Sequence, residues 1–462
     1  MKILTVVGDA LLDRDIVGTV DRICPDAPVP VLAVGGDHAR PGGAALAAAL
    51  ARRGRVDRVQ LVTALGDDAA GRQLAGLLVE LGIELIDLGT TGATAEKIRV
   101  RAADQSIVRI DRGGPTSEPG PWTIEAREAL ARSSAVLVSD YGRGVAAAGD
   151  GRDAIASVAA TTPVVWDPHP RGPIPVAGCR LVTPNQAEAS RSTEAATGSN
   201  AVGRAAADAD RLRAAWSAGA VAVTLGAAGA VLVDGAGTPL AVPAAPADGD
   251  PCGAGDCFAA TAATELAAGA LVSEAVTAAV AAASAFVARG GAAGLDLTAA
   301  SGTVRVDDPD GACRPSEPGL TVAAGGCFDL LHAGHVAMLQ AARALGDRLV
   351  VLLNSDDSVR RLKGPSRPLQ PAEDRAAVLL ALDCVDDVVV FDEQTPAEAL
   401  ERLRPDLFVK GGDYAVADLP EAKALAAWGG TAVTVPYLSG RSTTRLVTEA
   451  ARRSSTGSLV KE

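Results

Sequence analysis

The stretch "DGDPCGAGDCFAA", Asp248–Ala260, combines a glycine-rich turn with a carboxylate and leads into an alanine-rich segment. Gly253 and Gly255 let backbone N–H groups turn toward an anion at a helix N-terminus, where the helix dipole adds to the attraction. Asp256 lies at the edge of that turn. A carboxylate there opposes simple phosphate binding, but it suits a general base that removes a hydroxyl proton during attack on a phosphate. The structural alternative is a glycine-rich turn capped by an Asp.

Short apolar runs alternate with alanine-rich segments from residue 1 to about residue 297, and they predict an α/β fold. The runs are "ILTVVG", "AVLVSD", "PVVWDP", "RLVTPN", "AVAVTLG" and "AVLVDG". Strands that are apolar on both faces and separated by helices indicate a parallel sheet covered on both sides. Ligands bind at the carboxyl ends of such strands. Residues at these ends are therefore candidates for a site, namely Asp9, Asp140, Asp167, Asn185 and Gly226.

A second α/β alternation follows a segment rich in Pro, Gly and Asp. Its apolar runs are "LTVAAGG", "RLVVLLNSD", "VDDVVVFDE", "LFVKGGD" and "TAVTVPY". The 462-residue chain is too long for one ordinary core. We expect a larger domain over 1–303, a linker over 304–318 and a smaller domain over 319–462.

Composition excludes several classes of function. The chain has 43 basic and 56 acidic residues, a net charge of −13 and only 3% aromatic residues, which argues against nucleic-acid binding and against attraction to anionic lipid. The N-terminal "MKILTVVGDA" is too short in its apolar part for a signal peptide, and the alanine-rich segment after Glu274 favours a buried helix over a membrane span. Seven cysteines without CxxC pairs fit a reducing cytoplasm.

The stretch "GGCFDLLHAGH", Gly325–His335, holds two of the four histidines of the chain. Metal ligation is one interpretation, with Asp329 as a third ligand, and a purely structural pair is another. We prefer a third, in which a strand and a Gly-Gly turn lead into an amphipathic helix whose first turn carries both histidines. Side chains three apart share one helix face, so His332 and His335 would point together at an anion at the helix N-terminus.

That arrangement would hold the phosphates of a nucleotide and stabilise charge at its α-phosphorus. Transfer of a nucleotidyl group to another phosphate needs alignment and charge stabilisation but no general base, because the attacking phosphate is already ionised at neutral pH.

Several motifs in the first half resemble the ribokinase family of sugar kinases. The stretch around Asp256 resembles the DxxGAGD signature of that family. Its companions occur in the expected order: "GDALLDR", "RPGGAAL", "TPNQAE" with NxxE spacing, and "TLGAAG". Within the family the segments "RICPDAPVPVL", "EKIRVRAADQSIVRID" and "SDYGRG" resemble heptose 7-phosphate kinases most closely.

This resemblance implies a ribokinase-like three-layer sandwich with a small β lid, and it implies roles for individual residues. Asp256 would be the catalytic base. The nucleotide would be bound by Asn185, Glu188, Thr224, Gly226, Gly229, Gly253, Ala254 and Gly255, with Glu188 also a Mg²⁺ ligand. The sugar phosphate would be bound by Asp9, Asp13, Gly42, Gly43, Lys97, Arg99, Arg109 and Asp140. For the basic residues, together with Arg101, a solvated strand face is the alternative.

Three residues depart from the family pattern. Leu46 stands where an Asn that binds a sugar hydroxyl is usual, Cys252 where Thr is common, and His169 where Lys is common. Loss of the Asn hydrogen bond would cost about 1 to 3 kcal/mol. Since Asp256 and its glycines are present, we expect altered sugar recognition and an active kinase.

The second half resembles the cytidylyltransferase-like nucleotidyltransferases with an HxGH signature and a Rossmann-like fold. The companion motifs are "LNSDDSVRRLKG", "SRPLQPAEDR" with Arg367 and Arg375, "VKGGDY" with Lys410, and "GRSTTRLV". The resemblance implies that His332, His335 and Lys363 are catalytic. It implies nucleotide binding by Phe328, Asp413, Ser442 and Thr443.

Both halves together resemble the bifunctional enzymes that act as heptose 7-phosphate kinase and heptose 1-phosphate adenylyltransferase. The resemblance implies ATP as co-substrate at both sites, Mg²⁺, phosphorylated heptoses as substrates, a homodimer formed through the kinase domain, and a product, ADP-heptose, for surface glycans. Two alternatives stay open. The first half could be a weak or non-catalytic dimerisation module beside an active transferase, or both reactions could use another sugar or nucleotide.

Overall fold

The computed structural model describes residues 1–102, 105–113, 118–147, 149–191, 200–235, 237–294, 319–411 and 420–436. These residues form two compact units. The first contains the described residues up to 191, together with 212–224 and 247–294, and the second contains the others. The predicted linker, 304–318, lies outside the described residues, so the domain boundaries remain a prediction.

A parallel sheet forms the centre of the first unit. Its strands run in the order β11-β10-β9-β8-β1-β4-β5. Every residue of β1 is buried, as the apolar run "ILTVVG" predicts for a strand covered on both faces. The strands are β1 (Ile3–Gly8), β4 (Arg58–Thr63), β5 (Glu84–Asp87), β8 (Ala135–Ser139), β9 (Val164–Asp167), β10 (Leu181–Val182) and β11 (Val221–Thr224).

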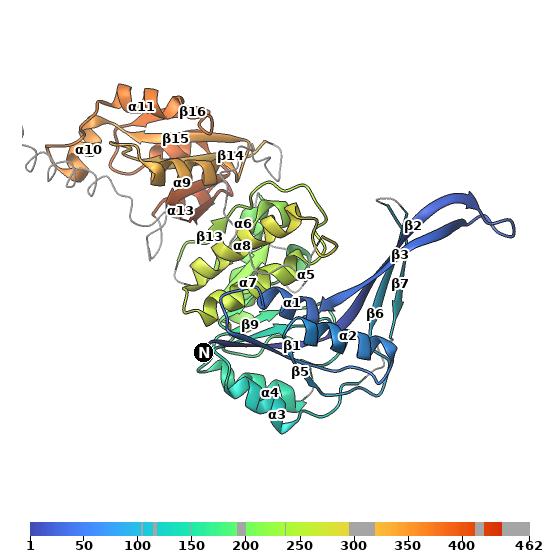
Figure 1. The fold of residues 1–462 in the computed structure, drawn as a ribbon. Helices are drawn as coiled ribbons and strands as arrows, with labels where there is room; N and C mark the ends of the chain where they lie inside the picture. The colour runs from blue at the N-terminus through green and yellow to red at the C-terminus, as the bar shows by residue number, and fades with distance from the viewer. Residues whose placement is uncertain are drawn as a thin grey trace, which may run out of the picture. The chain divides into compact units, whose positions relative to one another are not determined.

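Helices cover both faces of this sheet. Figure 1 shows α1, α2 and α7 on one side of the strands and α3 and α4 on the other. The alternation of strand and helix along the chain produces this three-layer arrangement, as predicted. The helices of this unit are α1 (Ala44–Ala51), α2 (Ala69–Glu80), α3 (Ile124–Ala131), α4 (Gly149–Ala159), α5 (Gln186–Arg191), α7 (Ala254–Ala267) and α8 (Val272–Ala288). Helix α6 (Ala201–Ala215) begins in the second unit and ends in the first.

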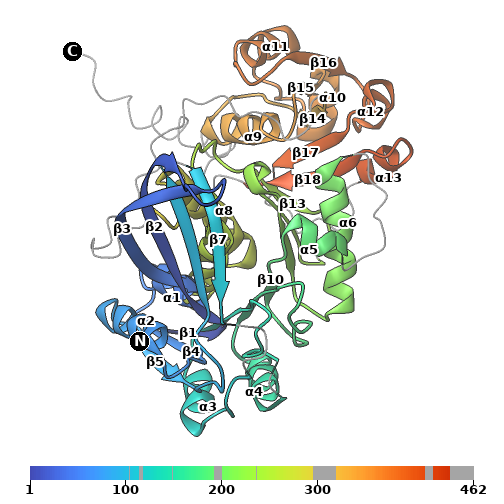
Figure 2. The same ribbon diagram turned by 90° about the vertical axis from the view of Figure 1, so that its right-hand side faces the viewer.

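A second sheet of four strands forms the predicted lid. Its order is β3-β2-β6-β7, with β2 (Ala10–Ile23), β3 (Pro30–Gly43), β6 (Glu96–Ala102) and β7 (Gln105–Arg112). Figure 2 shows β2, β3 and β7 side by side as a layer separate from β1, β4 and β5. Because β2 follows β1 after a single residue, Asp9, the lid begins at the carboxyl edge of the main sheet.

The second unit contains a five-stranded parallel sheet in the order β16-β15-β14-β17-β18. Buried side chains of β15, β16 and β17 form its core with α12 and α13. Its strands are β14 (Thr321–Gly326), β15 (Arg348–Asn354), β16 (Asp387–Phe391), β17 (Leu407–Gly411) and β18 (Thr431–Val435). Its helices are α9 (Ala333–Arg343), α10 (Asp356–Lys363), α11 (Ala372–Leu380), α12 (Ala397–Leu403) and α13 (Pro420–Ala426).

The same unit also includes the antiparallel pair β12 (Ala230–Val233) and β13 (Leu240–Val242), and the 3₁₀ turn η1 (Gly226–Ala228). The expected α/β fold is therefore confirmed in both halves of the chain. None of the described helices has the length and apolarity that a membrane crossing requires.

Candidate functional sites

The N-terminus of α7 places the predicted base in a buried position. Gly253 is the N-cap and has a left-handed backbone with φ 84°, which few residues other than glycine adopt readily. Asp256 follows in the first helical turn and is 6% exposed. A Cβ atom added to Gly255 would meet no atom within 4 Å, so this side of the turn is open. The glycine turn therefore leaves room for an anion beside a buried carboxylate.

Tyr141 provides the hydrogen bonds to that carboxylate. Its hydroxyl lies 2.8 Å from Oδ1 and 2.9 Å from Oδ2 of Asp256. Burial raises the pKa of Asp256 to about 7, although the Tyr141 hydrogen bond and the charge of Lys97 act in the opposite direction. A carboxyl group with this pKa is suited to accept and release a proton near neutral pH.

A second carboxyl group, Asp167, lies at the end of β9. It accepts a hydrogen bond of 2.8 Å from the Thr183 hydroxyl. Burial and the nearby Asp256 raise its pKa well above the ordinary value. Burial therefore disfavours the charged form of both neighbouring carboxyl groups, and each has one hydroxyl donor, Thr183 for Asp167 and Tyr141 for Asp256.

Asp9 organises the loop that carries Tyr141. Its carboxylate accepts backbone hydrogen bonds from Tyr141 at 3.0 Å, Arg143 at 2.9 Å and Val145 at 3.1 Å. These bonds fold residues 141–145 around the end of β1. Asp9 is thus in the predicted site, and its contacts in this structure are to the loop.

Asp140 lies beside Asp9 and is 3% exposed. One carboxylate oxygen accepts the Gly142 N–H at 2.7 Å, and the other has no hydrogen-bond partner among the described residues. Burial, and then the neighbouring Asp9, raise the pKa of Asp140 to about 7. Asp140 thus places a second, buried carboxyl group next to Asp9.

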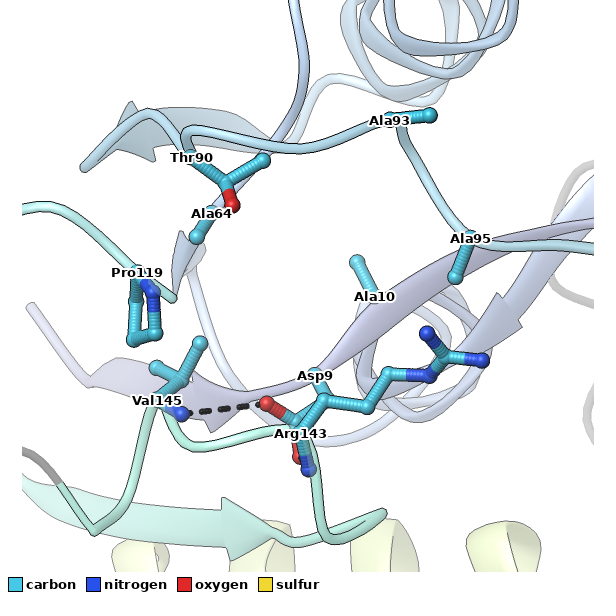
Figure 3. A pocket seen from close by; sticks show the side chains of 9 residues that line it. All are labelled: Asp9, Ala10, Ala64, Thr90, Ala93, Ala95, Pro119, Arg143 and Val145. Atoms are coloured by element: carbon cyan, nitrogen blue, oxygen red, sulfur yellow. Dashed lines mark hydrogen bonds between the residues drawn. The ribbon is translucent and has the colours of Figure 1, made fainter. Parts of the chain in front are cut away.

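A pocket opens next to Asp9 at the carboxyl ends of β1 and β4. Figure 3 shows its lining and the hydrogen bond from the Val145 N–H to Asp9. Small side chains form most of the wall, and Asp9, Thr90 and Arg143 add polar groups. The lining residues are Asp9, Ala10, Ala64, Thr90, Ala93, Ala95, Pro119, Arg143 and Val145.

One face of the lid sheet carries charged residues toward this site. Asp13 on β2 lies opposite Lys97 on β6, and Arg99 on β6 lies opposite Arg109 on β7. Because side chains alternate between the two faces of a sheet, these four residues lie on the same face. Arg99 forms an ion pair of 3.2 Å with buried Asp13 and donates to the Cys252 sulfur at 3.2 Å. Lys97 lies 6.0 Å from the centre of the Tyr141 ring.

Arg109 is placed differently from the other basic residues. It is exposed and forms a two-bond ion pair with Asp111, each bond 2.7 Å long. Arg109 therefore shares the face of Lys97 and Arg99, but it is more exposed than they are and its charge is paired with Asp111. A phosphate-binding role for each of the three remains a prediction.

Gly42 and Gly43 pack closely against Asp13 and Asp9. A Cβ on Gly42 would lie 2.8 Å from an Asp13 oxygen, and one on Gly43, whose φ is 57°, would lie 2.6 Å from the Asp9 carbonyl oxygen. Only glycine permits this close approach. Leu46, in the next helix, is buried in an apolar cluster with Cys257 and Phe286 and contributes packing below the Asp256 turn.

The NxxE pair forms a reciprocal helix cap. The Asn185 N–H donates to Glu188 at 2.9 Å, and the Glu188 N–H donates to Asn185 Oδ1 at 3.0 Å, at the start of α5. Asn185 also bridges to Thr224 at the end of β11. Gly226 and Gly229 have positive φ angles of 60° and 93°, as expected for a glycine-rich turn. Mg²⁺ binding by Glu188 remains a prediction.

The two histidines of the second unit lie together at the start of α9. His332 is the N-cap and His335 is in the first turn, with ring centres 3.8 Å apart and planes inclined by 19°. Phe328, which has a left-handed φ of 42°, packs at 5.2 Å from the His335 ring. The predicted convergence of the histidines at a helix N-terminus is seen in the structure.

Burial, and then His332 and Lys363, lower the pKa of His335 to about 4. His335 is therefore neutral at pH 7 in the free protein. Lys363 is exposed in the last turn of α10. Among the described residues no group of three His, Cys, Asp or Glu could hold a metal ion. Metal ligation by the pair thus finds no support in the part of the chain that is described.

Asp329, the possible third metal ligand, binds residues of the loop 367–370. It forms an ion pair with Arg367 and accepts the N–H groups of Leu369 and Gln370 at 2.6 and 3.4 Å. Burial acts to raise the pKa of Asp329, but these hydrogen bonds outweigh it and the pKa is below its ordinary value. Asp329 therefore joins the HxGH segment to residues 367–370.

Arg375 contacts the same region from the protein interior. It is completely buried and donates to the carbonyl oxygens of Cys327 at 2.7 Å and Asn354 at 2.9 Å, and to Asp356 at 2.6 Å. It is a support for the loops after β14 and β15. Lys410 pairs with Glu421 at 2.9 Å. Asp413, Ser442 and Thr443 lie outside the described residues.

Sequence reasoning did not assign roles to Tyr141 or Arg143, and it named Asp167 only as a candidate at the end of a strand. Tyr141 and Arg143 lie in the quoted motif "SDYGRG", and Asp167 ends a predicted strand, so each had a positional signal. A partner across the fold could not be deduced from these signals, because the Tyr141 and Asp256 side chains are 115 positions apart.

Comparisons with known proteins agree with this geometry. The family model of pfkB family carbohydrate kinases matches residues 1–299, and the cytidylyltransferase-like model matches residues 323–447. A solved ribokinase from Arabidopsis thaliana has a TM-score of 0.50 at 20% identity, covering 64% of this chain and 95% of that chain, which concerns the fold alone.

Two curated relatives extend over nearly the whole sequence. The bifunctional protein HldE of Streptomyces coelicolor is 55% identical over 459 residues, covering 97% of this chain and 96% of that protein. HldE of Azorhizobium caulinodans is 40% identical over 477 residues, covering 97% and 98%. This chain, a pfkB-type carbohydrate kinase followed by a cytidylyltransferase-like part, therefore belongs to the family of the bifunctional protein HldE.

Proposed function

We propose that the chain catalyses two reactions of ADP-heptose synthesis. The first transfers the γ-phosphate of ATP to the C1 hydroxyl of D-glycero-D-manno-heptose 7-phosphate. The second joins heptose 1-phosphate to the AMP part of ATP and releases pyrophosphate. The observation that carries the proposal is the presence of both sites, Asp256 in its glycine turn and the stacked histidines, in one member of the HldE family.

In the kinase reaction, Asp256 accepts the proton of the C1 hydroxyl. The hydroxyl oxygen forms its bond to the γ-phosphorus as the bond between that phosphorus and ADP breaks. The glycine turn at the N-terminus of α7 would stabilise the phosphate charge through its N–H groups. Asp9, Asp140 and the adjoining pocket provide hydrogen-bond acceptors for sugar hydroxyls, and Lys97 and Arg99 supply positive charge.

In the adenylyl transfer, the 1-phosphate oxygen attacks the α-phosphorus of ATP. His332 and His335 would donate N–H groups to the α-phosphate, and Lys363 would approach the triphosphate. The phosphates at C1 and C7 of the kinase product cannot both persist in the second substrate. A phosphatase that removes the 7-phosphate must therefore act between the two reactions.

The test follows products of the full-length protein by mass spectrometry. Heptose 7-phosphate or heptose 1-phosphate is supplied with ATP, CTP or GTP and magnesium. The 1,7-bisphosphate and ADP-heptose should form, each from its own substrate. Absence of the bisphosphate alone would favour a non-catalytic kinase-like module, an alternative motivated by Leu46 in its apolar cluster and by His169. A different sugar or base in the products would favour the other alternative.

Magnesium is proposed for both sites, because each reaction uses a triphosphate whose oxygens bind hard cations. Glu188 and Asn185, which cap the start of α5, would hold such an ion through their side-chain oxygens together with phosphate oxygens. We expect excess chelator to stop both reactions and added Mg²⁺ to restore them. Full activity of either reaction in chelator, measured by product formation, would remove the metal from that site.

We also propose that the protein acts in the cytoplasm as a homodimer formed through the lid. The face of the lid opposite Asp13 is apolar and exposed, with Val108 and Ile110 on β7 and Val34 on β3. A double change, Val34→Asp and Val108→Asp, should halve the mass in sedimentation equilibrium. An unchanged mass in the variant, or a monomeric wild type, would contradict the lid interface.

A further inference from the structure

We propose that Tyr141 is a positioning residue of the kinase reaction, whose hydroxyl holds the Asp256 carboxylate in one orientation to receive the sugar proton. This inference rests on the proposed kinase function. The geometry that carries it is a single phenol hydroxyl within 2.9 Å of both carboxylate oxygens. One proton is shared between the two oxygens, so the carboxylate cannot rotate about its terminal torsion without weakening this hydrogen bond.

The tyrosine is itself fixed by contacts from three elements. Its backbone N–H donates to Asp9 at 3.0 Å, at the end of β1. The His169 ring stacks on its ring at 6.2 Å with planes inclined by 22°, and Lys97 of β6 lies 6.0 Å from the ring centre. Since the His169 Nδ1 accepts the Arg171 N–H at 3.2 Å, the stacking ring is also held in place. His169, which departs from the family pattern, thus supports Tyr141.

Other charged groups surround the pair. Lys97 of β6, Asp13 of β2 and Asp167 of β9 act electrostatically on Asp256 or Tyr141. Asp13 is neutralised by Arg99, and Asp167 has its own hydroxyl donor in Thr183. Among these described groups, Tyr141 is the one that donates a hydrogen bond to Asp256. Removing the phenol hydroxyl should therefore make the ionised carboxylate less stable.

The test is the pH profile of the kinase reaction in a Tyr141→Phe variant, which keeps the ring and its contacts. A hydrogen bond to a charged group contributes enough for its loss to move the acid limb of kcat/KM upward by about one pH unit or more. At pH 6 the variant should be about tenfold slower than wild type, and part of the loss should be recovered at pH 8.5. Adenylyl transfer and the melting temperature should change little.

Two further measurements make the result specific. Thr183→Val removes a hydroxyl from Asp167 instead and should not raise the acid limb. Incorporation of 3-fluorotyrosine makes the phenol a stronger donor and should move the limb downward; of the three tyrosines only Tyr141 lies in the first half of the chain. This downward shift of the acid limb tests the inference even if the Phe variant fails to fold.

A measurement that needs no substrate distinguishes a failure of this inference from a failure of the proposed kinase function. Difference infrared spectra follow protonation of carboxyl groups, and subtraction of the Asp256→Asn spectra assigns the Asp256 band. Titration of that band at higher pH in Tyr141→Phe than in wild type would support the inference, even if the wild-type protein made no bisphosphate. Equal infrared titrations and equal acid limbs in the two proteins would overturn it.

Discussion

Replacing Asp256 with Asn should stop phosphoryl transfer and leave adenylyl transfer at the wild-type rate. The amide occupies the same space at the N-terminus of α7 but cannot accept the proton of the sugar hydroxyl. Loss of a general base lowers rates by about 10²- to 10⁴-fold. The measurement is formation of heptose 1,7-bisphosphate and of ADP-heptose by the same full-length variant.

The wild-type kinase should also lose activity in acid. The base must be ionised to act, and burial raises the pKa of Asp256 to about 7. As pH falls below about 7 the ionised fraction decreases, so kcat/KM should fall about tenfold per pH unit. The adenylyl transfer uses no general base and should have no such limb in the same samples.

Stability supplies a control for the Asn variant. Because the folded-state pKa of Asp256 is above its unfolded value of 3.8, the buried charge disfavours folding increasingly from about pH 4 to about pH 7, and fully above that. Removing the charge should leave the melting temperature at pH 8 equal to or above that of wild type. Asp248→Asn changes an exposed carboxylate before the same turn and should leave the kinase rate unchanged. A wild-type bisphosphate rate in Asp256→Asn would mean that another group is the base.

The features that sequence alone could predict are those fixed by local pattern. Apolar runs separated by helical segments predict a parallel sheet, and such a sheet places Asp9 and Asp140 at one edge whatever the strand order. The glycine turn before Asp256 and the i, i+3 spacing of the histidines are likewise local, because each lies within one helical turn. The structure places these residues as the sequence predicts, except that His332 is the N-cap of α9 and not a residue of its first turn.

Contacts between distant segments could not be predicted. The bond from Tyr141 to Asp256 depends on β8 lying near α7, and Asp9 binds the 141–145 loop because β1 and β8 are neighbours. The NxxE spacing is that of a helix cap as well as of the family motif, so spacing alone could not decide which contact Glu188 makes, nor whether Arg109 pairs with Asp111 on the same strand face. The periodicity of the sequence specifies the face of an element on which a side chain lies, whereas the packing of elements in the fold decides which residues that side chain contacts.

Replacing His332 or His335 with Ala should lower kcat of adenylyl transfer by about 10²- to 10³-fold, as for removal of an oxyanion donor. The two rings are stacked at 3.8 Å at the N-terminus of α9, where both can face the α-phosphate. The low pKa of His335, about 4, means that it enters the reaction as a neutral N–H donor unless bound phosphate raises its pKa. Asn, which keeps a donor, should therefore retain more activity than Ala.

The same variants distinguish the three interpretations of the histidine pair. If the pair were structural, the melting temperature would fall along with activity; if it bound a metal, the wild-type protein would contain that metal and the variants would lose it. We expect little change in stability, no lost metal and a wild-type kinase rate. His38→Ala, an exposed histidine on β3, is the matched control and should leave adenylyl transfer unchanged. Normal adenylyl transfer by His332→Ala would contradict the assignment of this site, because charge at the α-phosphate would then be stabilised by other groups.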